Sequence, residues 1–480
     1  MPQKISASLQ ENLAYLQNNF AASDDFYTKP LQISGICCAV AMFTGVSSAE
    51  RLCRLALDML DRDPAVWQGG AGLCRYLLQQ SRIPAEPSPA EDWQSAAAFL
   101  SNGMTLLFIE GFAGAVVLST QDMPGRSVGT PLGEGNLRGA QDAFTEHLRS
   151  NLSLLRRQFR SGTLVAEIAT ARCRAKTEYC LCYDRTLAPP ELVDALRQKL
   201  AEIEIPILLD SAYFASFFKQ DKLNLFPAAA YTERPATVCA RLCEGKLAVL
   251  VAGSPYALVI PGFFAEHFEC LDDYSSGAVF AGLIRLLKYL AFLLAVFAPG
   301  LYVMSVAFTP EIIPLQLLAK LAQGEQATPL PPMLEMLGVT LLLEIVREAG
   351  LRAPQSISHT VSLVGALILG ETAVSAGILS VPILITAAAA TIATLAVPSL
   401  YEQTILFRFA VILLAGCFGV PGLAAAAVTV LAMACGSEPF GYDYLYPLMP
   451  PGPAAWRDGF VRSIWSRLAR AGEVIGRDEA

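Results

Sequence analysis

Three long stretches in the C-terminal half of this chain carry almost no charge. Residues 286–308 contain one charged residue, residues 357–398 contain one acid and one histidine, and residues 409–435 contain neither. An apolar stretch of about 18 or more residues with few charges is typical of a transmembrane helix. Charges are scattered throughout the first 284 residues. The sequence therefore predicts soluble domains followed by a membrane domain.

The apolar stretches predict four membrane spans. They are expected at about residues 285–308, 358–377, 380–399 and 408–435. Basic residues gather before the first span and in the C-terminal tail: Arg285, Lys288, Arg457, Arg462, Arg467, Arg470 and Arg477. Such clusters mark the cytoplasmic side of a membrane, and an even number of spans puts both ends of the chain there.

Two segments of the membrane domain depart from simple spans. Residues 331–350 are apolar over a short length and carry four charges, which favours a re-entrant or interfacial helix. Gly419, Pro421 and Gly422 lie inside the last predicted span and are expected to bend or break it. Broken helices at membrane depth are tolerated where they are buried in protein or line a water-filled cavity.

Three carboxylates are candidates for an ion pathway or for coupling: Glu335, Glu344 and Glu371. A charge at the bilayer centre costs roughly 2.5–3.5 kcal/mol on insertion scales, so Glu371 is expected to face the bundle interior or an aqueous path. The alternative places Glu371 near a short turn at 377–380, in contact with headgroup water. Glu344 has Arg347 one helical turn away, and the two can pair.

The soluble half contains an internal repeat. Segments 99–119 and 241–261 share a pattern in which Gly103 corresponds to Gly245, 142 residues later. Each segment fits the end of a helix, a glycine, an apolar strand, a glycine turn and a second apolar strand, which predicts a β-hairpin.

A looser repeat lies upstream of each hairpin. Residues 37–60 and 177–200 each fit a strand followed by an amphipathic helix. The sequence thus predicts two similar α/β lobes, at about 30–120 and 165–262. A cleft between two lobes is a usual place for a small ligand; the alternative is that the lobes form only a structural platform.

Residues between the lobes predict a loop and then a helix that begins near Ala140. Its apolar stripe is Phe144, Leu148, Leu152 and Leu155, and its basic residues are Arg149, Arg156, Arg157 and Arg160. One interpretation is a linking helix with a solvated face. The other is a basic helix that lies near anionic lipid or an acidic neighbouring subunit.

The predicted fold class is α/β plus membrane α: two similar cytoplasmic lobes, then a helical bundle of about four spans with a re-entrant segment. The chain divides into a first lobe (1–122), a loop and linking basic helix (123–164), a second lobe (165–284), a transmembrane domain (285–450) and a basic cytoplasmic tail (451–480).

Several function classes fit the sequence poorly. The net charge of −8 speaks against a nucleic-acid binder, and the N-terminus lacks the pattern of a signal peptide. The twelve cysteines are scattered, as expected for small buried residues in a reducing compartment. The three histidines lie far apart and the cysteines lack a zinc spacing. We expect no metal site, no cofactor and no catalytic residue, because common enzyme motifs are absent.

Three segments carry a resemblance to a known family: "RGAQDAFTEHLRSNLSLLRR" (138–157), "YTERPATVCARLCEGKLAVLVAGSPYALVIP" (231–261) and "EIVREAGLRAPQSISHTVSLVGALILGETAVSAGILS" (344–380). Together they resemble the A subunit of the GerA-type spore germination receptor family, from about residue 138 to 398. The motif residues are Arg138, Gly139, Phe144, Glu146, Asn151, Leu155, Arg156, Tyr231, Thr232, Glu233, Arg234, Pro235, Glu244, Gly245 and Glu348–Gly350. Ala140 stands where the family usually has proline.

The resemblance implies a multi-pass protein of the spore inner membrane, surrounded by membrane lipid, that works with B and C subunits. It implies sensing of small nutrients, amino acids or sugars, and a homo-oligomeric ring that conducts monovalent cations. The alternative is the stage V sporulation protein AF type of paralogue, a non-sensing component that amplifies germination downstream of the receptors.

The segment 231–235 is predicted to be the mechanical joint between sensor and channel. In this hypothesis Glu233 and Arg234 pair with each other or with a neighbouring subunit, and Pro235 begins the next helix.

Overall fold

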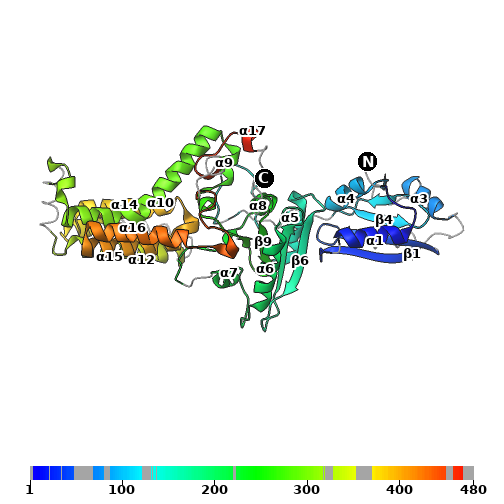
Figure 1. The fold of residues 1–480 in the computed structure, drawn as a ribbon, viewed down its shortest axis with the longest axis horizontal. Helices are drawn as coiled ribbons and strands as arrows, with labels where there is room; N and C mark the ends of the chain where they lie inside the picture. The colour runs from blue at the N-terminus through cyan, green and yellow to red at the C-terminus, as the bar shows by residue number, and fades with distance from the viewer. Residues whose placement is uncertain are drawn as a thin grey trace. The chain divides into compact units, whose positions relative to one another are not determined.

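The computed structural model describes most of the chain. The described residues are 4–20, 22–33, 35–47, 69–79, 87–121, 131, 133–136, 138–219, 223–316, 318, 328–352, 370–449 and 458–468. Within them the chain forms two compact units (Figure 1). The first unit comprises 4–219 and 228–262; the second comprises 223–227 and 263–468.

The first lobe of the first unit is a five-stranded antiparallel sheet with helices on both faces. Its elements are α1 (Leu9–Phe20), β1 (Phe26–Ile33), β2 (Ile36–Phe43), α3 (Gly69–Gln79), β3 (Ser88–Ala90), α4 (Trp93–Ser101), β4 (Thr105–Ile109) and β5 (Ala115–Leu118). The strand order is β1-β2-β4-β5-β3. Residues of α1 and α4 form a core on one face, and residues of α3 form a second core on the other.

The second lobe repeats this topology. Its elements are α5 (Leu148–Gln158), β6 (Leu164–Thr170), β7 (Glu178–Asp184), α6 (Pro190–Glu202), α7 (Ala212–Phe218), β8 (Ala230–Thr232), α8 (Pro235–Cys243), β9 (Leu247–Val251) and β10 (Ala257–Ile260). The order β6-β7-β9-β10-β8 matches the first sheet strand for strand. Helices α5 and α8 contribute to the core on one face, and Tyr179 of β7 contacts Phe214 of α7.

Both predicted hairpins are confirmed. Strand β4 pairs with β5, and β9 pairs with β10. The glycines that precede them, Gly103 and Gly245, have φ of 79° and 82°. Gly111 and Gly253, in the turns, have φ of 82° and 93°. A side chain with a Cβ is strained at such angles, which explains why the same glycines recur in both lobes.

The repeat includes one more helix than the sequence predicted. Asn12 of α1 binds the backbone N–H and carbonyl of Ser6, at 3.1 and 2.7 Å. Asn151 of α5 binds the same two groups of Thr145, at 2.7 and 2.5 Å. Helix α5, predicted as a linker, is thus the counterpart of α1 and forms part of the second core. It begins at Leu148 and not near Ala140.

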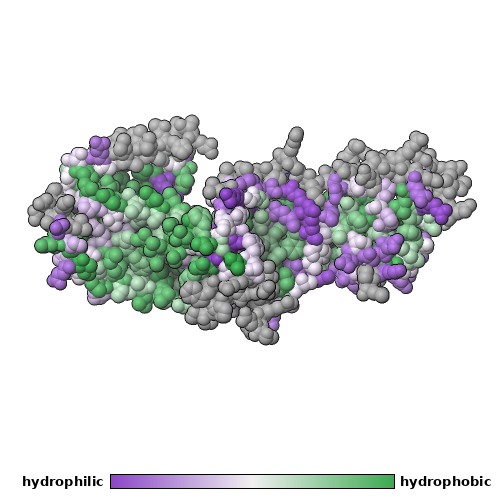
Figure 2. All heavy atoms as spheres, turned by 90° about the horizontal axis from the view of Figure 1, so that it is seen from above, coloured by the Kyte–Doolittle hydropathy of each residue, from purple (hydrophilic) through white to green (hydrophobic). Residues whose placement is uncertain are grey.

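The second unit is helical. Its elements are η2 (Phe264–Phe268), α9 (Leu271–Ser275), α10 (Ala278–Ala307), η3 (Pro310–Ile312), α12 (Pro332–Arg352), α14 (Val381–Thr394), η4 (Pro398–Leu400), α15 (Tyr401–Phe418), α16 (Val420–Cys435), η5 (Pro439–Gly441) and α17 (Trp465–Leu468). Figure 2 shows hydrophobic residues over much of the visible face of this helical part. Among the described residues, two helical stretches are long and apolar enough to cross a membrane: Ala278–Ala307 and Pro398–Phe418.

The predicted spans need correction. The first helix begins at Ala278, seven residues before the predicted start. The span predicted at 408–435 is two helices, because the chain turns at Gly419, whose φ is +64°. A Cβ on Gly422 would overlap the carbonyl oxygen of Leu414, so α16 packs closely against α15. The expectation that the glycines break this stretch is confirmed.

Two further predicted membrane segments are helical. Helix α12 is one continuous helix of 21 residues, which leaves the choice between a re-entrant and an interfacial segment open. Helix α14 has only 14 residues, fewer than the roughly 20 that a span needs. Most of the span predicted at 358–377 lies outside the described residues. The number of four spans is therefore not confirmed.

The cysteines are only partly buried. Cys38, Cys180 and Cys182 are buried as expected, whereas Cys37 is exposed. Residues alternate between the two faces of a strand, so neighbouring cysteines in β2 face opposite sides. Burial raises the pKa of the Cys38 thiol to about 12.

Candidate functional site

The predicted joint at 231–235 holds a distant part of the chain. Arg234 is 2% exposed, and its Nη1 donates to the carbonyl oxygen of Ala140 at 2.7 Å. Its Nη2 donates to the carbonyl oxygen of Glu134, and its Nε lies 3.6 Å from a Glu134 carboxylate oxygen. The guanidinium therefore fixes the loop before α5.

The rest of this motif holds the same loop. The Glu134 carboxylate accepts hydrogen bonds from the Thr232 hydroxyl at 3.0 Å and the Glu233 N–H at 3.2 Å. The Glu233 carboxylate accepts from the Gly133 N–H at 3.1 Å, and its carbonyl accepts from the Phe144 N–H at 2.7 Å. The predicted pairing of Glu233 with Arg234 is wrong, because each side chain binds the 133–144 loop. Pro235 begins α8, as predicted.

Burial affects the titration of this joint. Removal from water raises the pKa of the Glu134 carboxyl, and the opposing effects of Thr232 and Arg234 are smaller. A hydrogen bond to the Glu233 carboxylate, together with burial, raises the pKa of Tyr256 to about 12. Tyr231, the first residue of the motif, is 44% exposed on the edge strand β8. The Glu233 side chain thus lies out of water at 5% exposure, whereas the Glu134 side chain is 34% exposed.

The first family segment builds the start of the second lobe. Phe144 is buried in its core, and the Glu146 carbonyl accepts from the Gly253 N–H at 2.8 Å. Asn151 is fully buried and closes the turn before α5. Arg138 and Gly139 are exposed, and Gly139 has φ of 104°.

Arg156 ties the two lobes together. Its Nε and Nη2 donate to both carboxylate oxygens of Asp25 at 2.8 and 2.7 Å, and its Nη1 donates to the Leu164 carbonyl at 2.8 Å. The guanidinium also lies 4.0 Å above the ring of Phe43. Arg156 and Asp25 are 1% and 2% exposed. Arg156 is therefore not on a solvated or lipid-facing basic surface, as either interpretation of the helix assumed.

Glu244 and Gly245 end α8 and lead into β9. Glu244 is the C-cap residue and pairs with Arg241 at 3.0 Å. Gly245, with its positive φ, turns the chain into the strand. Both residues serve local structure in the described chain.

A short segment, 223–227, lies in sequence between α7 and β8 of the second lobe but belongs to the helical unit. We name this segment the strap. Asn224 Nδ2 donates to the Met433 carbonyl at 2.8 Å, and Gln403 Nε2 donates to the Leu225 carbonyl at 3.2 Å. Phe226 is 2% exposed within an aromatic cluster that includes Phe407. Sequence reasoning missed this segment, because its partners lie far along the chain.

The helical unit contains a charge cluster around the partly buried Glu344. Glu344 accepts from Arg347 Nε at 3.2 Å, which confirms that these two residues pair. It also accepts from the Tyr401 hydroxyl and lies 3.6 Å from Arg408. Arg408 is 1% exposed in α15. Sequence reasoning missed Arg408; the signal was a single basic residue at the border of an uncharged stretch.

The other two candidate carboxylates are apart from this cluster. Glu335 is 1% exposed; it accepts from the backbone N–H of Ser380, the N-cap residue of α14, and from the Thr328 hydroxyl at 3.3 Å. A carboxylate at a helix N-terminus is stabilised by the helix dipole. Glu371 is exposed within the described helical residues 370–375, and Gly377 after them has φ of 67°. The arrangement places Glu371 near the predicted turn.

The basic residues that suggested orientation are partly buried. Arg285 is fully buried and lies 2.9, 3.4 and 3.7 Å from carboxylate oxygens of Asp458, Asp273 and Glu269. Arg462 is 3% exposed and donates to the Ser276 carbonyl at 2.6 Å. These two side chains hold the described part of the tail against the start of α10, and are not free basic charges.

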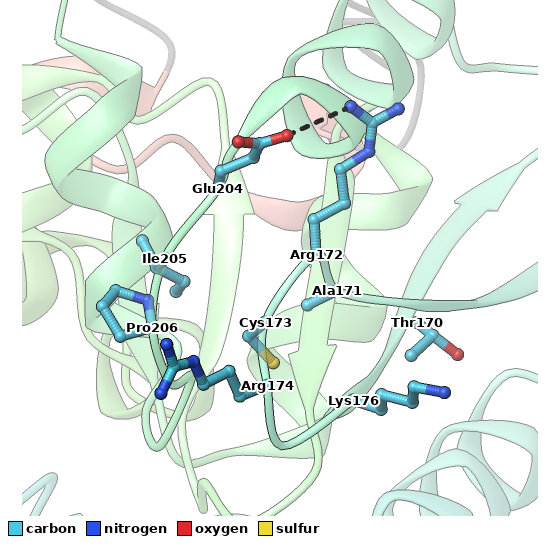
Figure 3. A pocket seen from close by; sticks show the side chains of 9 residues that line it. All are labelled: Thr170, Ala171, Arg172, Cys173, Arg174, Lys176, Glu204, Ile205 and Pro206. Carbon is cyan, nitrogen blue, oxygen red and sulfur yellow. Dashed lines mark ion pairs between the residues drawn. The ribbon is translucent and has the colours of Figure 1, made fainter.

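A hollow of about 890 Å³ lies beside the β6–β7 loop of the second lobe. Figure 3 shows that Arg174 and Lys176 point in different directions, while Arg172 faces Glu204 at 3.7 Å. A hydrogen bond from the Thr177 N–H lowers the pKa of the Cys173 thiol. Because the cations do not converge, the hollow is not a built anion site. Within the described residues no cluster of His, Cys, Asp and Glu suited to a metal is present.

Comparison with known proteins identifies the family. The model of the GerA family, described as Bacillus/Clostridium GerA spore germination protein, matches residues 14–473. The chain belongs to this family. Spore germination protein KA of Bacillus subtilis is 29% identical over 484 residues, covering 100% of this chain and 88% of that protein.

Two further comparisons give lower identities to this GerA family chain. Stage V sporulation protein AF of Bacillus subtilis is 26% identical over 362 residues, covering 74% of this chain and 72% of that protein. The solved N-terminal domain of the A subunit of the Bacillus megaterium spore germinant receptor GerK3 is 22% identical. That comparison covers 55% of this chain and 98% of the domain, with a TM-score of 0.44.

Proposed function

We propose that this chain is the A subunit of a nutrient-sensing germination receptor. The observation that carries the proposal is the GerA family match along residues 14–473. The longer coverage by germination protein KA than by stage V sporulation protein AF favours the receptor subunit. In this proposal the chain lies in the spore inner membrane with B and C subunits, with its lobes and its tail on the cytoplasmic side.

The proposed mechanism is a change in population between two states of an oligomeric helical bundle. A nutrient can shift such an equilibrium only if it binds one state better than the other. Binding of an amino acid or sugar to the complex favours a state that conducts monovalent cations. The two apolar helices that are long enough to cross a membrane and the buried charge of Arg408, 3.6 Å from Glu344, support a membrane role.

The joint and the strap give the proposal a route for coupling. The joint fixes the loop before α5 through Arg234. The strap, joined by the chain to α7 and β8, contacts α15 and α16 through Gln403 and Met433. A rearrangement of the second lobe would then pull on the helix pair through covalent connections.

Ion release from vesicles tests the function. The chain is reconstituted with its B and C subunits into vesicles loaded with K⁺, and efflux is measured with single amino acids and sugars. Nutrient-dependent efflux is expected. Absence of efflux under every nutrient, with all three subunits present, contradicts the proposal.

Glu371 provides a sharper test of the ion pathway. The exposed carboxylate is available to an aqueous path or to a neighbouring subunit, so Glu371→Gln is expected to change conduction more than assembly. Glu438→Gln, at an acidic residue outside the candidate set, is the matched control. Loss of assembly in Glu371→Gln would instead indicate a structural role.

The stage V paralogue type is the second candidate, and its relative supports it at 26% identity. Neighbouring genes separate the two candidates. Adjacent genes for B and C subunits favour the receptor, whereas a stage V operon favours the amplifier. Spores that lack this gene should lose the response to particular nutrients only if the receptor assignment is correct.

A further inference from the structure

Arg408 is surrounded by oxygen atoms from three other helices. Its Nε donates to the Ala295 carbonyl of α10 at 2.8 Å, and its Nη2 donates to the Ala390 carbonyl of α14 at 3.0 Å and to the Thr394 hydroxyl. Its Nη1 lies 3.6 Å from a Glu344 carboxylate oxygen of α12. The guanidinium thus sits in an oxygen-lined site, which we name the Arg408 site.

The backbone makes these oxygens available for local reasons. Pro299 lies inside α10 and has no N–H, so the Ala295 carbonyl lacks its usual helical donor four residues later. Thr394 is the last residue of α14, at the negative end of the helix dipole. The Ala390 carbonyl, one turn earlier, also accepts from the Thr394 hydroxyl at 2.9 Å. Neutral oxygens and one carboxylate therefore converge where a cation is favoured, whatever cation fills the site.

The charges of the described cluster do not cancel. Glu344 carries one negative charge, while Arg347 and Arg408 carry two positive charges between them, so the cluster repels further cations. The Nη1 of Arg408 has no hydrogen-bond acceptor, so the side chain fits the site incompletely. Removal of Arg408 would leave a neutral cluster whose oxygens lack a cation.

We propose that the Arg408 site is a monovalent-cation site that the Arg408 guanidinium occupies in the packed bundle. The inference rests on the proposed cation-conducting function: in the conducting state the guanidinium leaves and K⁺ or Na⁺ takes its place beside Glu344. While the guanidinium is in place, the site is closed to free cations. Arg408 is then a positioning residue that holds the packed state, and Glu344 is the ligand that it shields.

Thermal unfolding of the purified full chain in detergent tests the site without nutrient or partner subunits. Arg408→Ala is compared with the wild type in KCl and in N-methyl-D-glucamine chloride of equal ionic strength. Loss of a buried charge partner should lower the Tm of Arg408→Ala by about 5 °C in the large organic cation. K⁺ or added methylguanidinium should restore part of that loss, while the wild type shows no cation preference.

Two variants complete the design. Arg352→Ala removes an arginine that is 81% exposed and should behave like the wild type in both salts. Arg408→Ala with Glu344→Gln should lose the recovery by K⁺, because the carboxylate ligand is gone. If Arg408→Ala cannot be purified, Arg408→Gln takes its place in the same comparison.

The outcomes separate this inference from the proposed function. An Arg408 variant whose Tm is the same in K⁺ and in the organic cation overturns the cation site. Cation-specific stabilisation that depends on Glu344 supports the site, even if no vesicle shows nutrient-dependent efflux. That combination would contradict the proposed channel function and still support the cation site.

Discussion

The two lobes of the first unit build the same sheet, yet they differ at two corresponding positions. In the first lobe Asp92 caps α4 by accepting from the Ser95 N–H at 2.7 Å. The corresponding residue of the second lobe is Arg234, which provides no side-chain cap to α8. Similarly, exposed Gln17 of α1 corresponds to buried Arg156 of α5. At both positions the second lobe carries an arginine that binds a distant segment.

The two copies of the repeat therefore use these positions differently: Asp92 stabilises its own helix, whereas Arg234 and Arg156 bind other segments of the chain. An N-cap contributes about 1 kcal/mol to a helix, and the second lobe forgoes that contribution at α8. In return Arg234 fixes the 133–144 loop and Arg156 fixes the first lobe. The first lobe keeps a residue type that is common at helix N-caps, Asp92, and the start of α4 is explained by that local contact.

Arg156→Ala should have the largest effect on this comparison. Removal of one partner from a buried ion pair costs about 3–5 kcal/mol, since Asp25 would be left buried and uncompensated. Chemical unfolding of the full chain in detergent measures the loss, and Gln17→Ala, at the corresponding position of the first lobe, should stay within about 0.5 kcal/mol. Equal effects of the two substitutions would contradict the asymmetry.

Arg234→Gln should lower the stability less than Arg156→Ala but should reduce nutrient-dependent efflux more. Hydrogen bonds to a charged group contribute about 1.5–3 kcal/mol, and the amide of glutamine can keep one of them. The variant is expected to fold and reach the membrane but to lose nutrient-dependent efflux, because the loop before α5 is released. Failure to reach the membrane would count against a coupling role.

Asp92→Ala should remove only the local cap in the first lobe. The expected loss is about 1 kcal/mol, measured by the same unfolding experiment, and nutrient-dependent efflux should be retained. A functional loss as large as that of Arg234→Gln would show that the two positions are equivalent after all.

Glu134→Gln should have the smallest effect, visible as a change in pH dependence. Burial raises the pKa of this carboxyl above its ordinary value of 4.5. The folded state therefore binds the proton more tightly, so this contribution to stability is full at low pH and is lost as the pH rises through the raised value. The difference in Tm between wild type and variant should change across that range, and a constant difference would contradict the assignment.

The features of the fold that could be predicted are those fixed by neighbouring residues in the sequence. Glycines at positive φ and alternating apolar strands marked both hairpins. The correspondence of α1 with α5 was missed because its offset is 139 residues and not 142, and because few identical residues mark it. Gly419 marked the helix break, although the length of each helix could not be derived from apolar content alone.

The missed residues of the candidate site depend on distant partners. Asp25 and Arg156 are 131 residues apart, and Glu344 meets Arg408 across two helices. Sequence spacing does not show which charges converge in space. The family resemblance drew attention to Arg156 and Arg234, but their contacts required the structure.

The contacts of the strap can form only late in synthesis of the chain. Asn224 and its acceptor Met433 are 209 residues apart, which corresponds to about 10–40 s of translation at 5–20 residues per second. During that interval Phe226, buried in the finished chain, has no α15 to pack against. The strap therefore lacks its partners within the helical unit until α15 and α16 have been synthesised.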